Sequence, residues 1–177
     1  MKFSRSTDVF MPLDQATTQA FLGRGIHTLG LLRWILEQVG KADVYVSTFS
    51  TSDDFLSGFL RLRKDNLVEE SFLLADIKAA RKTLQLASLM QNCFSKVCLA
   101  PNHSKIVLVK NDKYCVSVIT SQNQTYGDRH ESTVVTTDKS VFNRLLHDYL
   151  GIINDKSVNI QHVLERRQLS SRVPGED

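Results

Sequence analysis

The sequence predicts an α/β domain whose mixed β-sheet is flanked by helices on both faces. In the first half, β-branched runs alternate with amphipathic segments of helical period, the order typical of parallel strands joined by helices. In the second half, β-like runs follow one another with short connections, as antiparallel strands do. The chain of 177 residues, 42% of them hydrophobic, is long enough for one such domain with its own core.

The first elements follow from hydrophobic period and from residues that begin and end helices. A short helix is predicted over residues 14–22, capped by Asp14 and ended by two glycines. A longer helix is predicted over 28–39, because leucines recur on one stripe and Gly40 follows. The alternating, β-branched run 42–50 predicts a strand.

The next elements continue the alternation. Thr51 or Ser52 caps a helix with two aspartates in its first turn, where carboxylates suit the helix dipole. A short buried strand over 71–75 and another helix over 77–91 follow it.

Strands and one helix fill the second half. Strands are predicted over residues 95–100, 103–110, 114–120 and 132–137. The turn Asn111-Asp112-Lys113 joins the second and third of these as a hairpin. An amphipathic helix is predicted over 141–153. The expected organisation is an N-terminal arm with the short helix (1–27), a single α/β domain (28–168) and a disordered tail (169–177).

Composition predicts a soluble cytoplasmic protein without metal or cofactor. Its 22 basic and 19 acidic residues give a net charge of +3, which is compatible with a polyanionic partner. No apolar run is long enough to span a membrane, and the first eleven residues lack the apolar core of a signal peptide. Three cysteines without framework spacing indicate reduced thiols. Cys93, Cys98 and His103 lack the spacing of a zinc site.

The tripeptide His103-Ser104-Lys105 stands at the head of the apolar run 106–109. On a strand, His103 and Lys105 would lie on the same face. An imidazole can act as a nucleophile, and an ammonium can hold an anion beside it. The tripeptide alone also fits a strand-end histidine next to a solvated lysine.

Further polar residues follow at predicted strand ends. Ser121 and Asn123 come after the strand 114–120, and Glu131 precedes the strand 132–137. Taken singly, Asn123 also fits a turn, and Glu131 fits a solvated loop.

Together these residues resemble the phospholipase D superfamily, whose signature is His-x-Lys on a strand, an Asp, a Ser-x-Asn after the next strand and a downstream Glu. The resemblance covers residues 28–153, and its specific part is 103–131. The sequence departs from the signature at Lys110, where the family has its Asp, and at Ile119-Thr120, which replaces a glycine-rich stretch. The family Asp is mainly a structural partner, so the catalytic set does not depend on it.

The resemblance implies metal-independent cleavage of phosphodiesters. His103 would attack phosphorus and form a phosphohistidine, while Lys105 and Asn123 hold the phosphate oxygens. Glu131 would accept a hydrogen bond from the other ring nitrogen of His103. Ser121 would contact the phosphate or support the residues that do.

A single copy of the motif lacks the second histidine that protonates the leaving group. Family members with one copy supply it by pairing two subunits. We therefore expect a homodimer in which two His103 residues face each other across a two-fold axis.

The expected substrate is nucleic acid, because single-motif bacterial members of the family resemble nonspecific endonucleases. Lys78, Arg81 and Lys82 have helical spacing and would form a basic stripe for phosphates, or else a solvated helix face. Two other functions stay open: a non-catalytic nucleic-acid-binding module of the same fold, and a phospholipid phosphodiesterase.

Overall fold

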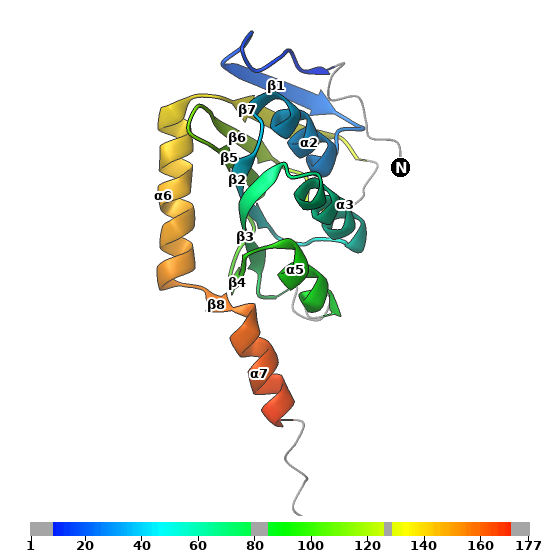
Figure 1. Ribbon diagram of the computed structural model, residues 1–177, viewed down its shortest axis with the longest axis vertical. Helices are drawn as coiled ribbons and strands as arrows, with labels where there is room; N and C mark the ends of the chain where they lie inside the picture. The colour runs from blue at the N-terminus through cyan, green and yellow to red at the C-terminus, as the bar shows by residue number, and fades with distance from the viewer. Residues whose placement is uncertain (1–8, 79–84, 126–128, 171–177) are drawn as a thin grey trace, which may run out of the picture.

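The computed structural model describes residues 9–78, 85–125 and 129–170, with side chains through Glu165. Its strands form one mixed eight-stranded sheet of order β1-β7-β6-β5-β2-β3-β4-β8 (Figure 1). The strands are β1 (Thr18–Gly23), β2 (Ala42–Thr48), β3 (Val68–Asp76), β4 (Lys96–Ala100), β5 (Ile106–Lys110), β6 (Cys115–Thr120), β7 (Glu131–Thr136) and β8 (Val158–Asn159). The helices are α2 (Thr28–Val39), α3 (Asp53–Lys64), α5 (Ala87–Cys93), α6 (Lys139–Asp155) and α7 (Ile160–Ser170).

The predicted fold class is confirmed. Strands β2, β3 and β4 are parallel, and the remaining pairs in the sheet are antiparallel. Helices α2, α3 and α5 cover one face of the sheet, and α6 covers the other (Figure 1). The helix expected after Thr51 or Ser52 begins with Ser52 as its cap, since the Ser52 hydroxyl accepts from the backbone N–H of Phe55.

Two hydrophobic clusters hold the layers together. The larger lies under α2, α3 and α5, where Phe59 is fully buried and stacks on Phe94 with ring centroids 4.4 Å apart. The smaller joins α6 to the opposite face, and the buried Tyr149 hydroxyl donates to Val46 O at 3.2 Å. Burial raises the pKa of the Cys93 thiol to about 11, so this thiol stays protonated and unreactive at neutral pH.

The helix predicted over residues 14–22 is wrong. Residues 18–23 form β1, which pairs antiparallel with β7 from Thr18↔Thr136 to Gly23↔Glu131. The Thr18 and Thr136 hydroxyls also hydrogen-bond across the pair at 2.8 Å. Pairing with β7, more than 100 residues away in the sequence, decides the conformation here, because local propensity is a weak constraint beside tertiary pairing.

Several other predictions differ at element boundaries. The last part of the helix expected over 77–91 is present as α5, whereas residues 79–84 lie outside the described residues. The expected tail begins inside α7, and residues 171–177 lie outside the described residues. In the described part of the chain, no helix is both long and apolar enough to cross a membrane.

Candidate active site

The topology brings the predicted site segments to one end of the sheet, which we call the carboxyl end. The parallel strands β2, β3 and β4 all finish there. Strand β5 runs antiparallel to β2, so it begins at this end, and by the same alternation β6 finishes and β7 begins there. The turn that carries His103 and Lys105 therefore lies close to Ser121 and Glu131.

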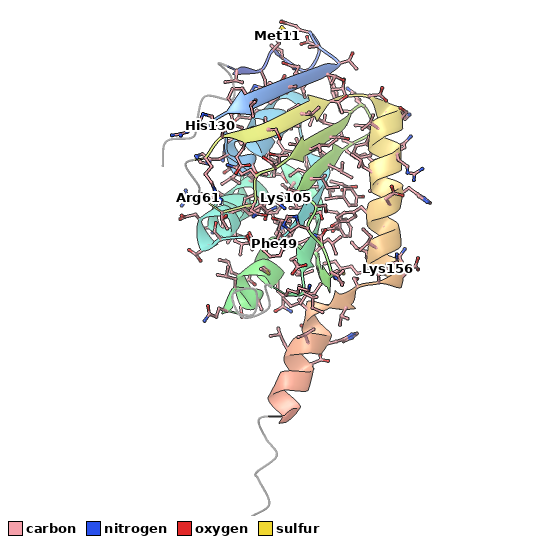
Figure 2. All side chains as sticks on the ribbon, turned by 180° about the vertical axis from the view of Figure 1, so that it is seen from behind. Met11, Phe49, Arg61, Lys105, His130 and Lys156 are labelled. Carbon is pink, nitrogen blue, oxygen red and sulfur yellow. The ribbon has the colours of Figure 1, made fainter. Side chains whose placement is uncertain are left out.

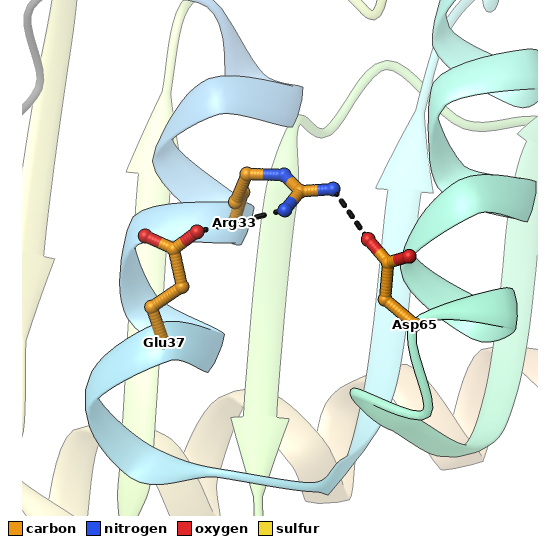
Figure 3. Close-up of polar contacts among 3 residues, drawn as sticks. All are labelled: Arg33, Glu37 and Asp65. Carbon is orange, nitrogen blue, oxygen red and sulfur yellow. Dashed lines mark hydrogen bonds and ion pairs between the residues drawn. The ribbon is translucent and has the colours of Figure 1, made fainter.

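The His103–Lys105 pair precedes β5, which begins at Ile106, so the prediction that it lies on the strand is wrong. The two side chains nevertheless meet. Lys105 Nζ lies 3.2 Å from His103 Nδ1 and donates to His103 O at 2.7 Å. The Phe49 ring packs beside both groups, 5.0 Å from the His103 ring and 6.0 Å from Lys105 Nζ; Figure 2 shows Phe49 and Lys105 close together. An imidazole and a cation are thus held together by the loop before β5 and by the Phe49 ring.

Asn102 holds this turn in place, and sequence reasoning missed it. Its side chain is 8% exposed and donates from Nδ2 to Ser47 Oγ, Thr48 O and Leu74 O at 2.9, 3.2 and 3.3 Å. Its Oδ1 accepts from the Ser104 N–H and hydroxyl at 3.1 and 2.7 Å. One amide therefore fastens the central residue of the His-Ser-Lys tripeptide to the ends of β2 and β3.

Asp76 also holds the segment that carries His103 and Lys105, through its bond to Asn102. It is 4% exposed at the end of β3, and its carboxylate accepts from Asn102 N at 2.8 Å and from Lys78 N at 2.7 Å. The Ser47 and Ser104 hydroxyls, both partners of the Asn102 side chain, lie 2.5 Å apart. The only signal in the sequence is the pair Pro101-Asn102, which marks a turn but does not reveal these partners.

Ser121 and Glu131 lie beside the pair. Thr120 N donates to Lys105 O at 3.0 Å, which places the end of β6 next to Lys105. The Ser121 hydroxyl donates to the Glu131 carboxylate and accepts from Ser132 N at 3.0 Å. Partial burial lowers the pKa of Lys105 below its ordinary value, and the charge of Glu131 opposes that shift. His103, Lys105, Ser121 and Glu131 thus form one cluster.

Two predicted details are not seen among the described contacts. Glu131 hydrogen-bonds to Ser121, whereas we expected it to accept from His103. No hydrogen bond joins Asn123 to His103 or Lys105 in the described part of the chain, and its buried Oδ1 has no hydrogen-bond partner there. The Asn123 side chain instead lines a pocket of about 360 Å³ formed by residues 122–125 and the first residues of α2 and α3.

Of the predicted basic stripe, Lys78 is exposed just beyond β3, whereas Arg81 and Lys82 lie outside the described residues. A cation that the sequence analysis did not single out lies nearby: Arg24 Nε is 3.4 Å from His130 Nδ1, next to Glu131. No group of three or more His, Cys, Asp or Glu side chains within the described ranges is arranged to hold a metal ion.

Lys110, which stands where the phospholipase D signature has an Asp, lies at the opposite end of β5. It is the cross-strand neighbour of Asp43 at the start of β2. Five residues of strand separate it from Lys105, about 17 Å. The departure from the family signature at this position therefore does not change the composition of the cluster.

Comparison with solved structures supports the same fold. The chain is similar to NucT from Helicobacter pylori with a TM-score of 0.62 and 14% identity over 80% of this chain and 98% of that one. Nuc from Salmonella typhimurium, a phospholipase D family member, gives 0.56 and 12% over 80% and 97%. Polyphosphate kinase from Porphyromonas gingivalis gives 0.60 and 9%, and the match covers 86% of this chain but 30% of that one. No protein-family model matches the chain, and no curated protein matches its sequence. The expected phospholipase D-like fold is confirmed at the level of the backbone.

Proposed function

We propose that this protein is a metal-independent phosphodiesterase, a nonspecific DNA or RNA endonuclease that acts through His103 in a homodimer. The observation that carries the proposal is the contact between the His103 imidazole and the Lys105 ammonium at the carboxyl end of the sheet. Glu131 and Ser121 lie beside this pair, and the fold is shared with Nuc, a phospholipase D family member. The three free thiols fit an enzyme of the reducing cytoplasm.

The proposed reaction has two steps. The neutral imidazole of His103 attacks phosphorus, so that an N–P bond forms and the bond from phosphorus to the leaving oxygen breaks. Water then attacks the phosphohistidine and gives a proton to the second His103 of the dimer, the N–P bond breaks, and the imidazole is restored. The leaving oxygen receives its proton from the second His103 of the dimer, because one pair cannot supply both nucleophile and acid.

Lys105 and Glu131 have complementary parts in this scheme. Lys105 turns from the imidazole to the phosphate oxygens and neutralises the charge that develops on them. This movement frees His103 Nδ1 to donate to a carboxylate, and we assign that carboxylate to Glu131, which Ser121 holds in place. Asn123 would reach the phosphate from the neighbouring loop.

The test is cleavage by the purified full chain in the presence of a chelator. The substrates are supercoiled plasmid, single-stranded DNA, RNA and phospholipid vesicles, and we expect cleavage of nucleic acid. A gel shift without any cutting would identify a binding module, and activity on vesicles alone would identify a phospholipid phosphodiesterase. Sedimentation of the same sample should give a dimer; a fully active monomer would contradict the shared site.

The pH dependence should report the charge on Lys105. Because the ammonium is lost as the pH rises through its pKa, cleavage should fall at alkaline pH. Glu131→Gln removes the charge that opposes the lowering of this pKa, so the fall should begin at a lower pH than in the wild type. Rates measured across the alkaline range provide the comparison, with Glu70→Gln, at the opposite end of the sheet, as control. An alkaline limb that does not move in Glu131→Gln would contradict the assignment.

A further inference from the structure

We propose that the pocket beside the candidate active site binds an unpaired nucleobase. The pocket has a volume of about 360 Å³ and lies between residues 122–125 and the first turns of α2 and α3. Its size is within the range of sites for small organic groups, about 300–1,000 Å³. Three features of the pocket point to this ligand: one buried amide, the chemistry of the walls and the position of the pocket.

The buried amide is Gln124. The residue is 5% exposed, and neither Oε1 nor Nε2 has a hydrogen-bond partner among the described residues. Buried polar atoms in folded proteins nearly always have partners, since an unpaired amide loses its hydration without compensation. Gln122, two residues earlier, follows that rule: its Oε1 accepts from the Thr28 N–H and hydroxyl at 3.0 and 3.2 Å.

The Gln124 backbone is fixed, so its unpaired amide is not the result of a loose loop. Gln124 N donates to Ser50 O at 3.2 Å, and the Ser52 hydroxyl donates to Gln124 O at 2.8 Å. The same residue forms an isolated parallel bridge with Thr51, whose buried hydroxyl also has no partner among the described residues. The wall of the pocket at Gln124 therefore holds an unpaired donor and an unpaired acceptor, and Thr51 lies behind it.

The walls of the pocket favour a flat, uncharged ligand with N–H groups. A carboxamide presents a donor beside an acceptor, the pattern that pairs with the edge of a nucleobase. Leu29 and Phe55 supply apolar surface for a ring, and Phe55 is held by its stack on Phe59. The Asp54 carboxylate also lines the pocket; it would repel a phosphate but attract the exocyclic amino group of a base.

The position of the pocket connects base binding to the reaction. Ser121 contacts Glu131 in the candidate active site, and Gln124 follows three residues later, at most about 11 Å along the chain. A base in the pocket would place its own backbone phosphate near His103 and Lys105. A paired and stacked base cannot enter such a pocket, so this consequence, which rests on the proposed function, makes single-stranded nucleic acid the preferred substrate.

The test compares two glutamine variants of the full chain. Gln124→Met should weaken the binding of adenosine and cytidine, measured by titration, at least tenfold without lowering Tm, because no bond within the described protein is lost. Gln122→Met, which removes the bonds to Thr28, should lower Tm and serves as the matched control. Should Gln124→Met fail to fold, Asp54→Ala at an exposed position should weaken adenosine and cytidine more than uridine.

The outcomes separate this proposal from the proposed function. Nucleoside binding that depends on Gln124 supports the pocket even if the protein cuts nothing. Absence of nucleoside binding, equal binding by Gln124→Met, or displacement of the nucleoside by inorganic phosphate would overturn it even if the protein is a nuclease. If the protein is a nuclease, the ratio of its cleavage rates on single-stranded and double-stranded DNA should fall toward one in Gln124→Met. An unchanged ratio would overturn the link between base binding and cleavage.

Discussion

His103→Ala should abolish chelator-resistant cleavage, with a loss of about 10³-fold or more, because the variant has neither the nucleophile nor the acid of the paired site. The fold should survive, since His103 is exposed and its ring lies beside Lys105 and Phe49 outside the hydrophobic clusters. Initial rates on plasmid DNA in EDTA give the measurement, with unfolding curves to confirm that stability is unchanged. His147→Ala, at an exposed position of α6, is the control and should cut at the wild-type rate. A His103→Ala protein that keeps a tenth of the activity would rule out the proposed nucleophile.

The same variant tests whether the two subunits share a site. When equal amounts of wild type and His103→Ala exchange subunits at random, about one quarter of the dimers carry two intact histidines. If both histidines are needed for one cleavage, activity should fall to about one quarter of that of the all-wild-type sample. Independent sites would leave about one half.

Asn102→Ala should lower both stability and cleavage. The variant loses the amide that joins Ser47, Leu74 and Ser104, and it leaves the Ser47 hydroxyl and the Leu74 carbonyl buried without this partner. We expect the free energy of unfolding to fall by about 2–4 kcal/mol, since several buried hydrogen bonds are lost together. Cleavage should fall as well, because the turn that presents His103 is no longer fastened to β2 and β3.

The matched control for this prediction is Asn111→Ala. Asn111 also donates to backbone carbonyls, to Val39 O at 2.8 Å, and accepts from Tyr114 N at 2.9 Å, but it lies in the hairpin at the opposite end of the sheet. This variant should lower stability and leave the cleavage rate per folded molecule unchanged. Urea denaturation and initial rates measure the two effects. Wild-type cleavage by folded Asn102→Ala would show that the turn does not depend on this amide.

Local pattern predicted most of the fold, because most elements carry their signals within themselves. Helix α2 has its apolar stripe and Gly40, α3 has Ser52 at its cap, and β5 and β6 have a hairpin turn between them. Strand β1 could not be predicted in this way. It is a strand because β7 offers it a partner, and no residue near Thr18 reveals that pairing.

In the candidate site, too, features carried by neighbouring residues were predicted and features formed by distant residues were not. The sequence predicted that His103 and Lys105 lie on one face of a strand; the structure places them in the loop before β5, with Lys105 Nζ 3.2 Å from His103 Nδ1. The support from Asn102 and Asp76 joins the ends of three strands, so it becomes visible only when the sheet is assembled. The unpaired amide of Gln124 is likewise a property of the surroundings, since Gln122 has the same side chain and finds its partners.

The separation of the two ends of the sheet also bears on how such a chain can evolve. Substitutions at the end that holds Lys110 and its neighbour Asp43 affect strand pairing, whereas substitutions at the carboxyl end affect the His103 cluster and the pocket. Because few residues take part in both, a lineage can exchange the chemistry at one end without rebuilding the other. The fold that this chain shares with NucT at 14% identity shows that one backbone tolerates very different sequences.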